Sequence, residues 1–354
     1  MNSEILPTHT PELFQNAVAR AAELLCAGQV VALPTETVYG LAANALDERA
    51  VARIYEAKGR PAHNPIIVHV ASAEMAQRCV FKWLPAADKL ARCFWPGPLT
   101  LVLSRARAIP DIVTASGPTV GVRWPSHPFI QAVIQKCGFP LAAPSANLSN
   151  RISPTNAAHV HAQLGNKVPL IVDGGQSQVG IESTVLDLTT EPATILRPGM
   201  IHAESLSAVI GKVAGEQGEV SRTTPLRSPG QLKRHYSPRA KLLVLRWQDD
   251  QELYSQLLPV ASIFHRCHVV AHTRIPATED FGRVSVIPHD AEAFARALYA
   301  ELHRCDEAGA ELIVVEAPPA TPEWSAITDR LTRAAATDKE TTDHKNLPIG
   351  RKVH

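Results

Sequence analysis

The stretch from Val30 to Leu41, VVALPTETVYGL, decides the fold of this chain. Its first four residues, Val30 to Leu33, are apolar, which is typical of a short buried strand. They lead into Pro34-Thr35-Glu36-Thr37, where hydroxyls and a carboxylate occupy a turn closed by Gly40. Polar groups at the end of a buried strand predict an α/β sheet that binds a ligand at this edge. A capped turn of ordinary Thr and Gly residues is an equally good interpretation of the stretch alone.

Strands and helices alternate on both sides of this stretch. Apolar residues at helical spacing, or a capping residue before them, predict helices over residues 11–27, 47–57, 86–94, 128–136 and 156–164. Apolar β-rich runs predict strands over residues 66–70, 99–103, 120–123, 141–143, 170–173, 183–188 and 194–197. Several neighbours are joined too tightly for crossover helices, so we expect an α/β fold with a mixed, twisted sheet and helices packed on it.

The second half of the chain predicts a smaller α/β domain of Rossmann-like, mostly parallel type. Strands are expected over residues 242–245, 269–271, 284–287 and 312–315, and helices over 249–258, 290–304 and 322–335. No Gly-x-Gly-x-x-Gly follows a strand there, so nothing argues for a dinucleotide. We expect a catalytic domain (1–210), a linker (211–239) that serves as a lid, a C-terminal domain (240–336) and a polar tail (337–354).

The composition of the chain argues against several classes of protein. The 354 residues carry a formal net charge of +1, which argues against a tight nucleic-acid binder. The six cysteines form no Cys-x-x-Cys pair and predict buried thiols in a reducing compartment. The N-terminus lacks signal-peptide features, and no apolar run approaches the roughly 18 residues of a membrane span. We expect a cytoplasmic protein with no membrane contact.

Four cations are candidates for anion binding. Lys58 and Arg60 stand two residues apart on a loop stiffened by Gly and Pro, while Arg123 and Arg197 end strands. Clamping of phosphate oxygens is one interpretation. A solvated helix C-terminus for the first two, and surface ion pairs for the others, are the alternatives. If all four share one hollow with the hydroxyls and amides nearby, the site suits a triphosphate and an amino acid. There is no Walker-type loop, so side chains must bind the phosphates.

Ordered motifs along the chain resemble those of the YrdC/Sua5 family, in its long Sua5 form. They are Pro34–Leu41, Lys58–Val70, Trp95–Thr100, Ala143–Ser149, Ser183–Val185, Leu196–Gly199 and the linker segment Ser228–Pro238. The resemblance implies a YrdC-like twisted sheet and threonylcarbamoyl-AMP synthase activity. Such an enzyme converts L-threonine, bicarbonate and ATP into threonylcarbamoyladenylate and pyrophosphate. Asn150-Arg151-Ile152 stands where Gly-Arg-Pro is common in the family.

The resemblance also implies site residues, by motif. For L-threonine they are Thr35, His69, Arg123, Ala143 and Ser183. For ATP they are Lys58, Arg60, Asn64, Thr114, Ser145, Asn147, Arg151, Arg197 and Tyr236. Mg²⁺ is expected with ATP, held largely by phosphate oxygens and water. Tyr236, on the linker, would close over the site.

The implied product would pass to the tRNA threonylcarbamoyl-transfer machinery, for t6A formation at position 37 of tRNAs that read ANN codons. Two alternatives remain open at this stage. One is a transferase that handles carbamoyl-adenylate, although its usual acylphosphatase domain and Cys-x-x-Cys fingers are missing here. The other is a YrdC-like module that binds RNA weakly and has no catalytic activity.

Overall fold

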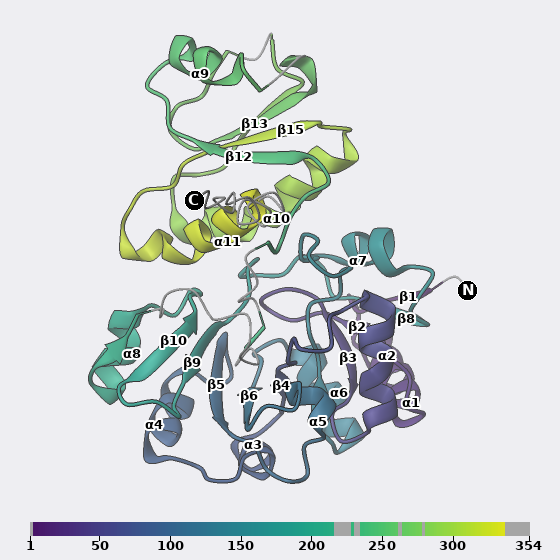
Figure 1. The fold of residues 1–354 in the computed structure, drawn as a ribbon. Helices are drawn as coiled ribbons and strands as arrows, with labels where there is room; N and C mark the ends of the chain where they lie inside the picture. Colours follow the sequence, from purple (N-terminus) through teal and green to yellow (C-terminus); the bar gives the residue numbers. More distant parts are fainter. Residues whose placement is uncertain (1–2, 216–227, 230–233, 261–263, 278–279, 337–354) are drawn as a thin grey trace, which may run out of the picture.

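The chain forms two sheets, one in each half, with a shared core between the halves (Figure 1). The computed structural model describes residues 3–215, 228–229, 234–260, 264–277 and 280–336. The predicted tail (337–354) and most of the linker between 216 and 233 lie outside these residues.

The first sheet has eleven strands among the described residues. They are β1 (Glu4–Pro7), β2 (Val31–Leu33), β3 (Gly40–Asn44), β4 (Val68–His69), β5 (Leu99–Ser104), β6 (Thr119–Arg123), β7 (Leu141–Ala142), β8 (Leu170–Asp173), β9 (Thr184–Asp187), β10 (Ala193–Arg197) and β11 (Val213–Ala214). Their order is β1-β8-β2-β3-β7-β4-β6-β5-β9-β10-β11. Parallel and antiparallel pairs occur together, which confirms the mixed sheet.

Eight helices pack on this sheet. They are α1 (Pro11–Cys26), α2 (Glu48–Lys58), α3 (Ala73–Cys79), α4 (Pro85–Phe94), α5 (Asp111–Thr114), α6 (Pro128–Cys137), α7 (Ala157–Leu164) and α8 (Ala203–Ile210). The helix predicted from Asp47 begins as expected, because the Asp47 carboxylate accepts a hydrogen bond from the Arg49 N–H. Gly59 ends the same helix in the left-handed conformation.

Six elements of this half were not predicted, namely β1, β3, β11, α3, α5 and α8. β3 is the sequence GLAAN, whose Gly and Ala carry little β-propensity; it forms because it pairs with β2 and β7. α3 and α8 are short helices. The predicted strand over 66–70 is shorter in the structure, where only Val68 and His69 are paired as a strand.

The second sheet has four strands, all joined in parallel, as predicted. In order they are β12 (Lys241–Leu245), β15 (Leu312–Glu316), β13 (Cys267–Ala271) and β14 (Arg283–Val286). The helices are α9 (Asp250–Leu257), α10 (Ala291–Glu307) and α11 (Ser325–Ala335), with 3₁₀ turns η1 (Phe264–Arg266) and η2 (Pro322–Trp324).

Helices α10 and α11 lie on the side of the second sheet that faces the first half (Figure 1). One hydrophobic cluster joins Val38 and Ile181 of the first half to Phe294 and Tyr299 of α10. Gly180 touches α10 so closely that an added Cβ would lie 2.4 Å from Arg296 Cα. The two halves are therefore packed together rather than merely tethered.

Among the described residues, no helix combines the length and apolar character that crossing a membrane requires. All six cysteines are free, as expected, but Cys26 and Cys93 are exposed rather than buried.

Candidate active site

A small enclosed hollow lies where the loops after several strands of the first sheet meet the linker. Its walls include all five residues of the threonine set, namely Thr35, His69, Arg123, Ala143 and Ser183. They also include four residues of the ATP set, namely Arg60, Ser145, Arg197 and Tyr236. Its volume is about 50 Å³, room for a few water molecules. Pro229, His235 and Tyr236 close one side of it, so the linker covers this hollow.

Sheet register places two of these residues side by side. β4 and β6 run parallel, and His69 is paired in register with Arg123. Burial lowers the pKa of His69 to about 3, and the Arg123 charge lowers it further than Glu36 restores it. His69 is therefore a neutral imidazole at physiological pH, and its Nδ1 has no hydrogen-bond partner among the described residues.

Arg123 is held by three groups around the hollow. Its Nε donates to Gly97 O at 3.2 Å, and its Nη1 donates to Thr37 Oγ1 at 3.0 Å. Its Nη2 lies 2.7 Å from Glu36 Oε1, and both side chains are almost fully buried. Burial alone would raise the pKa of Glu36, but the Arg123 charge and the Ser126 N–H outweigh it and keep the pKa below its usual range. Glu36 is thus an ionised partner of Arg123.

Arg197 and Ser183 form a second polar corner. Arg197 Nε donates to Ser183 O and Nη2 donates to Ser183 Oγ, both at 3.0 Å. Ser183 Oγ also lies 2.8 Å from Thr100 Oγ1. Burial lowers the pKa of Arg197. No carboxylate forms an ion pair with Arg197 among the described residues, so its charge stays available to an anion in the hollow.

Arg60 shares the hollow and is fixed by its own loop. Its Nη2 donates to Asn64 Oδ1 and to Pro65 O, each at 2.7 Å. Burial lowers the pKa of Arg60 to about 10, which leaves it charged at neutral pH. Asn64 therefore fixes the position of the Arg60 guanidinium by accepting its hydrogen bond. The Nδ2 of Asn64 has no hydrogen-bond partner among the described residues.

Lys58 is the exception among the four candidate cations, because it does not line the hollow. Its Nζ donates to Ser145 O and Asn147 O at 2.5 Å, and to Asn147 Oδ1 at 3.3 Å. Burial, with the Arg60 charge, holds the pKa of Lys58 well below its ordinary value. The Lys58 side chain thus supports the loop from Ser145 to Asn147 through hydrogen bonds to its carbonyl groups. We expected all four cations to share one hollow, but only Arg60, Arg123 and Arg197 line it.

The remaining ATP candidates lie around the hollow rather than in its wall. Asn147 donates from Nδ2 to Arg151 O at 2.7 Å. Arg151 is exposed and reaches toward Pro238 O at 3.5 Å. Thr114 lines an adjoining pocket with Ile67 and Val102. Asn150 adopts a left-handed φ of 64°, a conformation that Gly adopts freely and Asn tolerates, which explains why Gly is common at this position of the family.

The linker residue Tyr236 is buried against the second domain. Its φ is 61°, a sparsely populated conformation for a side chain of this size. The Tyr299 ring lies 5.9 Å from its ring, and the Arg330 guanidinium carbon lies 5.2 Å above it. Burial lowers the pKa of the neighbouring His235 to about 3, so His235 is neutral. Packing from α10 and α11 therefore holds the linker over the hollow.

The described residues do not form a protein metal site. They hold no group of three or more His, Cys, Asp or Glu side chains suited to a metal. The carboxylates nearest the hollow, Glu36 and Glu182, are each paired with an arginine. Magnesium therefore stays a prediction as a companion of the ATP phosphates.

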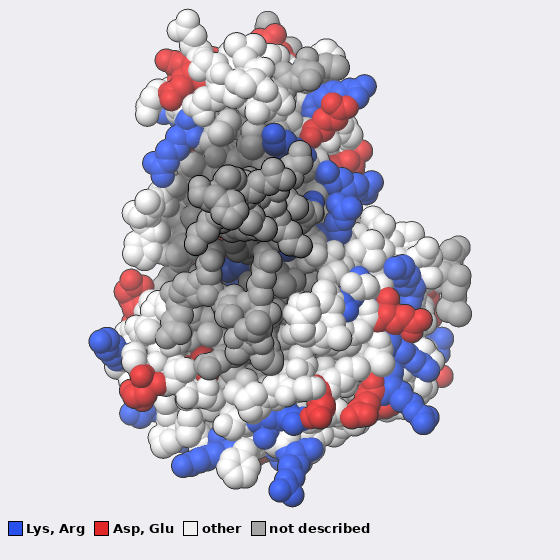
Figure 2. All heavy atoms as spheres, in the orientation of Figure 1, with Lys and Arg blue, Asp and Glu red and all other residues white. Residues whose placement is uncertain are grey.

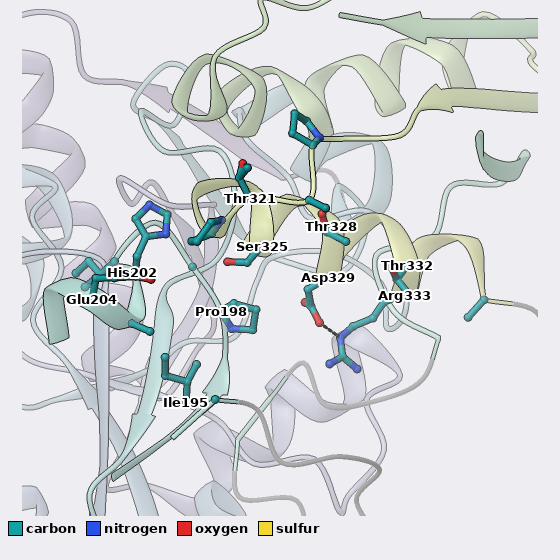
Figure 3. Close-up of a pocket in the computed structure, with 18 residues that line it drawn as sticks. Ile195, Pro198, His202, Glu204, Thr321, Ser325, Thr328, Asp329, Thr332 and Arg333 are labelled. Atoms are coloured by element: carbon teal, nitrogen blue, oxygen red, sulfur yellow. Dashed lines mark hydrogen bonds and ion pairs between the residues drawn. The ribbon is translucent and has the colours of Figure 1, made fainter. Parts of the chain in front are cut away.

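A larger cleft of about 910 Å³ lies between the two domains, next to the hollow (Figure 3). Ile195, Pro198 and His202 form one wall, and residues of α11 form the other. Arg333 and Asp329 face the cleft as an ion pair at 2.7 Å. Among the described residues the lining is mainly apolar and carries no cluster of cations, so it is less suited to phosphates than that of the smaller hollow.

Charges of both signs are spread over one face of the molecule (Figure 2). The face shown in Figure 2 carries Lys and Arg interspersed with Asp and Glu, not a continuous basic surface. This face gives no support to a module that binds RNA electrostatically.

Several residues in the wall of the hollow or just behind it had no assigned role in the sequence interpretation. Thr37 and Glu36 were visible in the opening motif, and their contacts with Arg123 depend on sheet pairing. Glu182 lies beside Ser183 and also lines the hollow. Arg330 lies far along the chain, and no local pattern marks it as a neighbour of Glu182.

Comparisons with known proteins agree across both domains. A family model described as "Telomere recombination" (Sua5_yciO_yrdC) matches residues 23–199, and one described as "Threonylcarbamoyl-AMP synthase, C-terminal domain" matches residues 201–336. The chain is 38% identical to threonylcarbamoyl-AMP synthase of Pyrococcus abyssi over 319 residues, 89% of this chain and 93% of that one. It is 40% identical to threonylcarbamoyl-AMP synthase of Bacillus subtilis over 332 residues, 92% and 95% of the two chains.

A solved structure, that of P. abyssi Sua5 complexed with L-threonine, superimposes with a TM-score of 0.85 at 36% identity. The match covers 95% of this chain and 98% of that one. The chain therefore belongs to the Sua5/YrdC family of threonylcarbamoyl-AMP synthases, in the long form that carries the Sua5 C-terminal domain.

Proposed function

We propose that this protein joins L-threonine, bicarbonate and ATP into threonylcarbamoyl-AMP, with release of pyrophosphate, and that the central hollow is where it does so. The observation that carries the proposal is the shared wall: the whole threonine set lines the same hollow as Arg60 and Arg197. An amino acid and a phosphate chain bound there would be in contact, as adenylation of a threonine derivative requires.

The threonine end of the site is assigned to the side of His69 and Arg123. Arg123 offers its guanidinium to the amino-acid carboxylate, in partial competition with Glu36. Neutral His69 offers a hydrogen bond to the threonine hydroxyl or amine. The Thr35 hydroxyl donates to Val38 O at 2.6 Å, so it would have to exchange that bond to contact the substrate. A similar protein, P. abyssi Sua5, has been solved in complex with L-threonine.

The nucleotide end is assigned to Arg60, Arg197 and the Ser145 loop. The adjoining pocket offers Ile67, Val102 and Val185 as apolar walls and Thr114 as a polar edge, a lining that suits an adenine ring. Its volume is only about 10 Å³ with Ser228 and Pro229 in place, so these linker residues would have to move away to admit the ring. Arg60 and Arg197 line the hollow that adjoins this pocket, and the phosphates would lie against them. Lys58, Asn64, Asn147 and Arg151 would then support this end through the loops they hold.

The proposed chemistry needs positioning and charge neutralisation more than a covalent nucleophile. The threonine amine adds to bicarbonate with loss of water, giving a carbamate. A carbamate oxygen attacks the α-phosphorus, the bond to the β-phosphate oxygen breaks, and pyrophosphate leaves. Arg60 and Arg197 offset the negative charge of the phosphates. A cover of His235 and Tyr236 would shield the short-lived carbamate from water.

The closed hollow is too small for both substrates, so the linker must open to admit them and close again for turnover. We expect the adenylate to pass to the machinery that transfers threonylcarbamoyl to tRNA. Any binding of RNA by this chain would be weak.

Pyrophosphate release from ATP tests the proposed function. The expected result is release that requires both threonine and bicarbonate, with threonylcarbamoyl-AMP identified by mass spectrometry. Release without threonine but with carbamoyl phosphate would favour the carbamoyl transferase instead. Steeply salt-dependent RNA binding with no release would favour the RNA-binding module.

A further inference from the structure

A buried carboxylate of the first domain is neutralised by the second domain. Glu182 lines the central hollow, next to Ser183. Its Oε2 accepts hydrogen bonds from Arg330 Nε of α11 at 2.8 Å and from Tyr299 OH of α10 at 3.1 Å. Its Oε1 accepts from Ser153 Oγ at 2.6 Å. The carboxylate is thus satisfied mainly by groups that arrive with the C-terminal domain.

The Glu182–Arg330 pair is strongly ionised and fully enclosed. Burial would raise the pKa of Glu182, but the charges of Arg330 and Arg197 and the Ser153 hydroxyl lower it to about 2. The Arg330 side chain is 0% exposed. Its Nη2 also donates to Pro198 O at 3.0 Å, directly after Arg197 in the chain. Removing the cation would leave an uncompensated negative charge in the wall of a site proposed to bind a triphosphate.

Arg197 is the cation that such a carboxylate would attract. The charge of Glu182 already acts on Arg197, as it does on Arg330. Arg197 now binds Ser183 and forms no ion pair with Glu182 among the described residues. Arg330 therefore forms the ion pair with Glu182, and the Arg197 guanidinium remains available to an anion in the hollow.

Arg330 also contacts the linker. Its guanidinium carbon lies 5.2 Å from the centre of the Tyr236 ring, and Tyr299 contacts the same ring. A cation over an aromatic ring in a desolvated site is a favourable contact. One side chain of α11 thus reaches both the wall of the hollow and its cover.

We propose that Arg330 is a positioning residue for adenylation: by holding Glu182 and Tyr236, it keeps Arg197 available to the ATP phosphates and the linker closed over them. This proposal rests on the proposed function. It assigns the C-terminal domain a direct part in nucleotide binding, through a residue that is remote in the sequence.

The test compares steady-state kinetics of the full-length Arg330→Met, Glu182→Gln and double variants with the wild type. We expect Arg330→Met to raise KM for ATP by about tenfold or more, because the freed Glu182 repels phosphate and draws Arg197 away. The double variant removes both charges of the Glu182–Arg330 pair, and Asp329, the other carboxylate paired with Arg330, keeps Arg333 as a partner. It should therefore recover most of that loss and return KM for ATP to within about threefold of the wild type. Arg304→Met, on the exposed side of α10, serves as the matched control and should leave KM unchanged.

Binding of a non-hydrolysable ATP analogue, followed by calorimetry, separates nucleotide binding from chemistry and should follow the same order. If Arg330→Met does not fold, as judged by its thermal unfolding, the double variant and Arg330→Lys carry the comparison. A wild-type KM for ATP in folded Arg330→Met, or no recovery in the double variant, would overturn the proposal. Absence of threonylcarbamoyl-AMP from the wild type would instead refute the proposed function.

Discussion

At the scale of single residues, the buried cations Lys58, Arg60 and Arg197 are held by carbonyl, hydroxyl and amide oxygens. None of the three forms an ion pair with a carboxylate among the described residues. Burial lowers the pKa of each, which is the cost of keeping an unneutralised cation out of water. For Arg60 and Arg197, which line the hollow, that cost is recovered when an anion arrives, because these cations then gain a partner in a medium of low dielectric constant. The first domain is therefore prepared for a highly charged ligand.

Lys58 gives a prediction at this scale. Lys58→Met removes the donor that Ser145 O and Asn147 O share, so the loop that carries Ser145 should loosen. Because buried acceptors lose their partner, we expect a loss of about 1–3 kcal/mol in the free energy of unfolding. The KM for ATP should rise by about tenfold, with KM for threonine little changed.

Urea unfolding and initial-rate kinetics measure these effects. Lys89→Met, at an exposed position of α4, is the control for loss of a lysine charge. An unchanged KM for ATP in a destabilised Lys58→Met would show that the loop does not contribute to nucleotide binding.

At the scale of elements, the site is assembled by loops that follow strands, and α10 and α11 close it from the other side. The contact of α10 with the loop before β9 depends on Gly180, whose φ is 84°. An added Cβ there would lie 2.4 Å from Arg296 Cα and 2.5 Å from Ala295 O, both backbone atoms of α10 that cannot move aside alone. The second domain can therefore pack this closely only because residue 180 is a glycine and has no Cβ.

This geometry predicts that Gly180→Ala displaces α10. Gly175→Ala is a matched control: its φ is 77°, so it carries similar backbone strain, yet nothing lies within 4 Å of the added Cβ. We expect Gly175→Ala to cost about 1–2 kcal/mol and Gly180→Ala to cost a further 1–3 kcal/mol or so from overpacking. Thermal unfolding, together with the rate of proteolysis in the linker, measures the difference. Equal effects of the two substitutions would contradict a close contact at Gly180.

Much of the first domain could be predicted from local patterns, for stated physical reasons. Helix α1 has a capping Thr10, a Pro at its first position and apolar residues at helical spacing, so its bounds were clear. β3 was missed because its Gly and Ala residues carry little β signal, and it is a strand only through its partners.

The site residues also divide into those marked by a local motif and those whose role depends on distant partners. Thr35 and Ser183 were predicted to contact threonine because the family resemblance implies this role for their motifs. Glu182, which precedes Ser183 in the chain, was given no role, since its role depends on Arg330, which is 148 positions away. Long-range contacts of this kind leave no periodicity in the sequence, and only the docking of the two domains makes them visible.

At the scale of the whole molecule, the interface between the domains contains histidines that must stay neutral. The rings of His159 and His303 stack with centroids 3.9 Å apart, and His303 Nε2 lies 3.2 Å from Ser153 O. Burial lowers the pKa of His159 to about 3 and that of His303 to about 4. Together with His235, at about 3, these side chains make acid unfavourable to the docked state.

The sign of the pH dependence follows from these pKa values. In the unfolded chain the same histidines titrate near 6.5, so below that pH the unfolded state binds more protons than the folded state. Stability should therefore be nearly constant above pH 7 and fall as the pH drops from 6.5 toward 4, by about 1 kcal/mol per pH unit for each histidine. The Glu182 ion pair affects stability at lower pH. Its contribution is fully present above about pH 4.5 and is lost as the pH falls toward the folded-state pKa of Glu182, which is about 2.

Urea unfolding between pH 7.5 and 4.5 measures this dependence without interference from Glu182. Replacing His303 by Gln removes one of the two stacked rings and can still donate a hydrogen bond to Ser153 O. It should flatten the slope by about one proton, because the amide does not titrate. A stability that rises on acidification, or a slope that His303→Gln leaves unchanged, would show that these rings are protonated in the folded protein. The interface would then be held together by charge rather than by the exclusion of protons from stacked neutral rings.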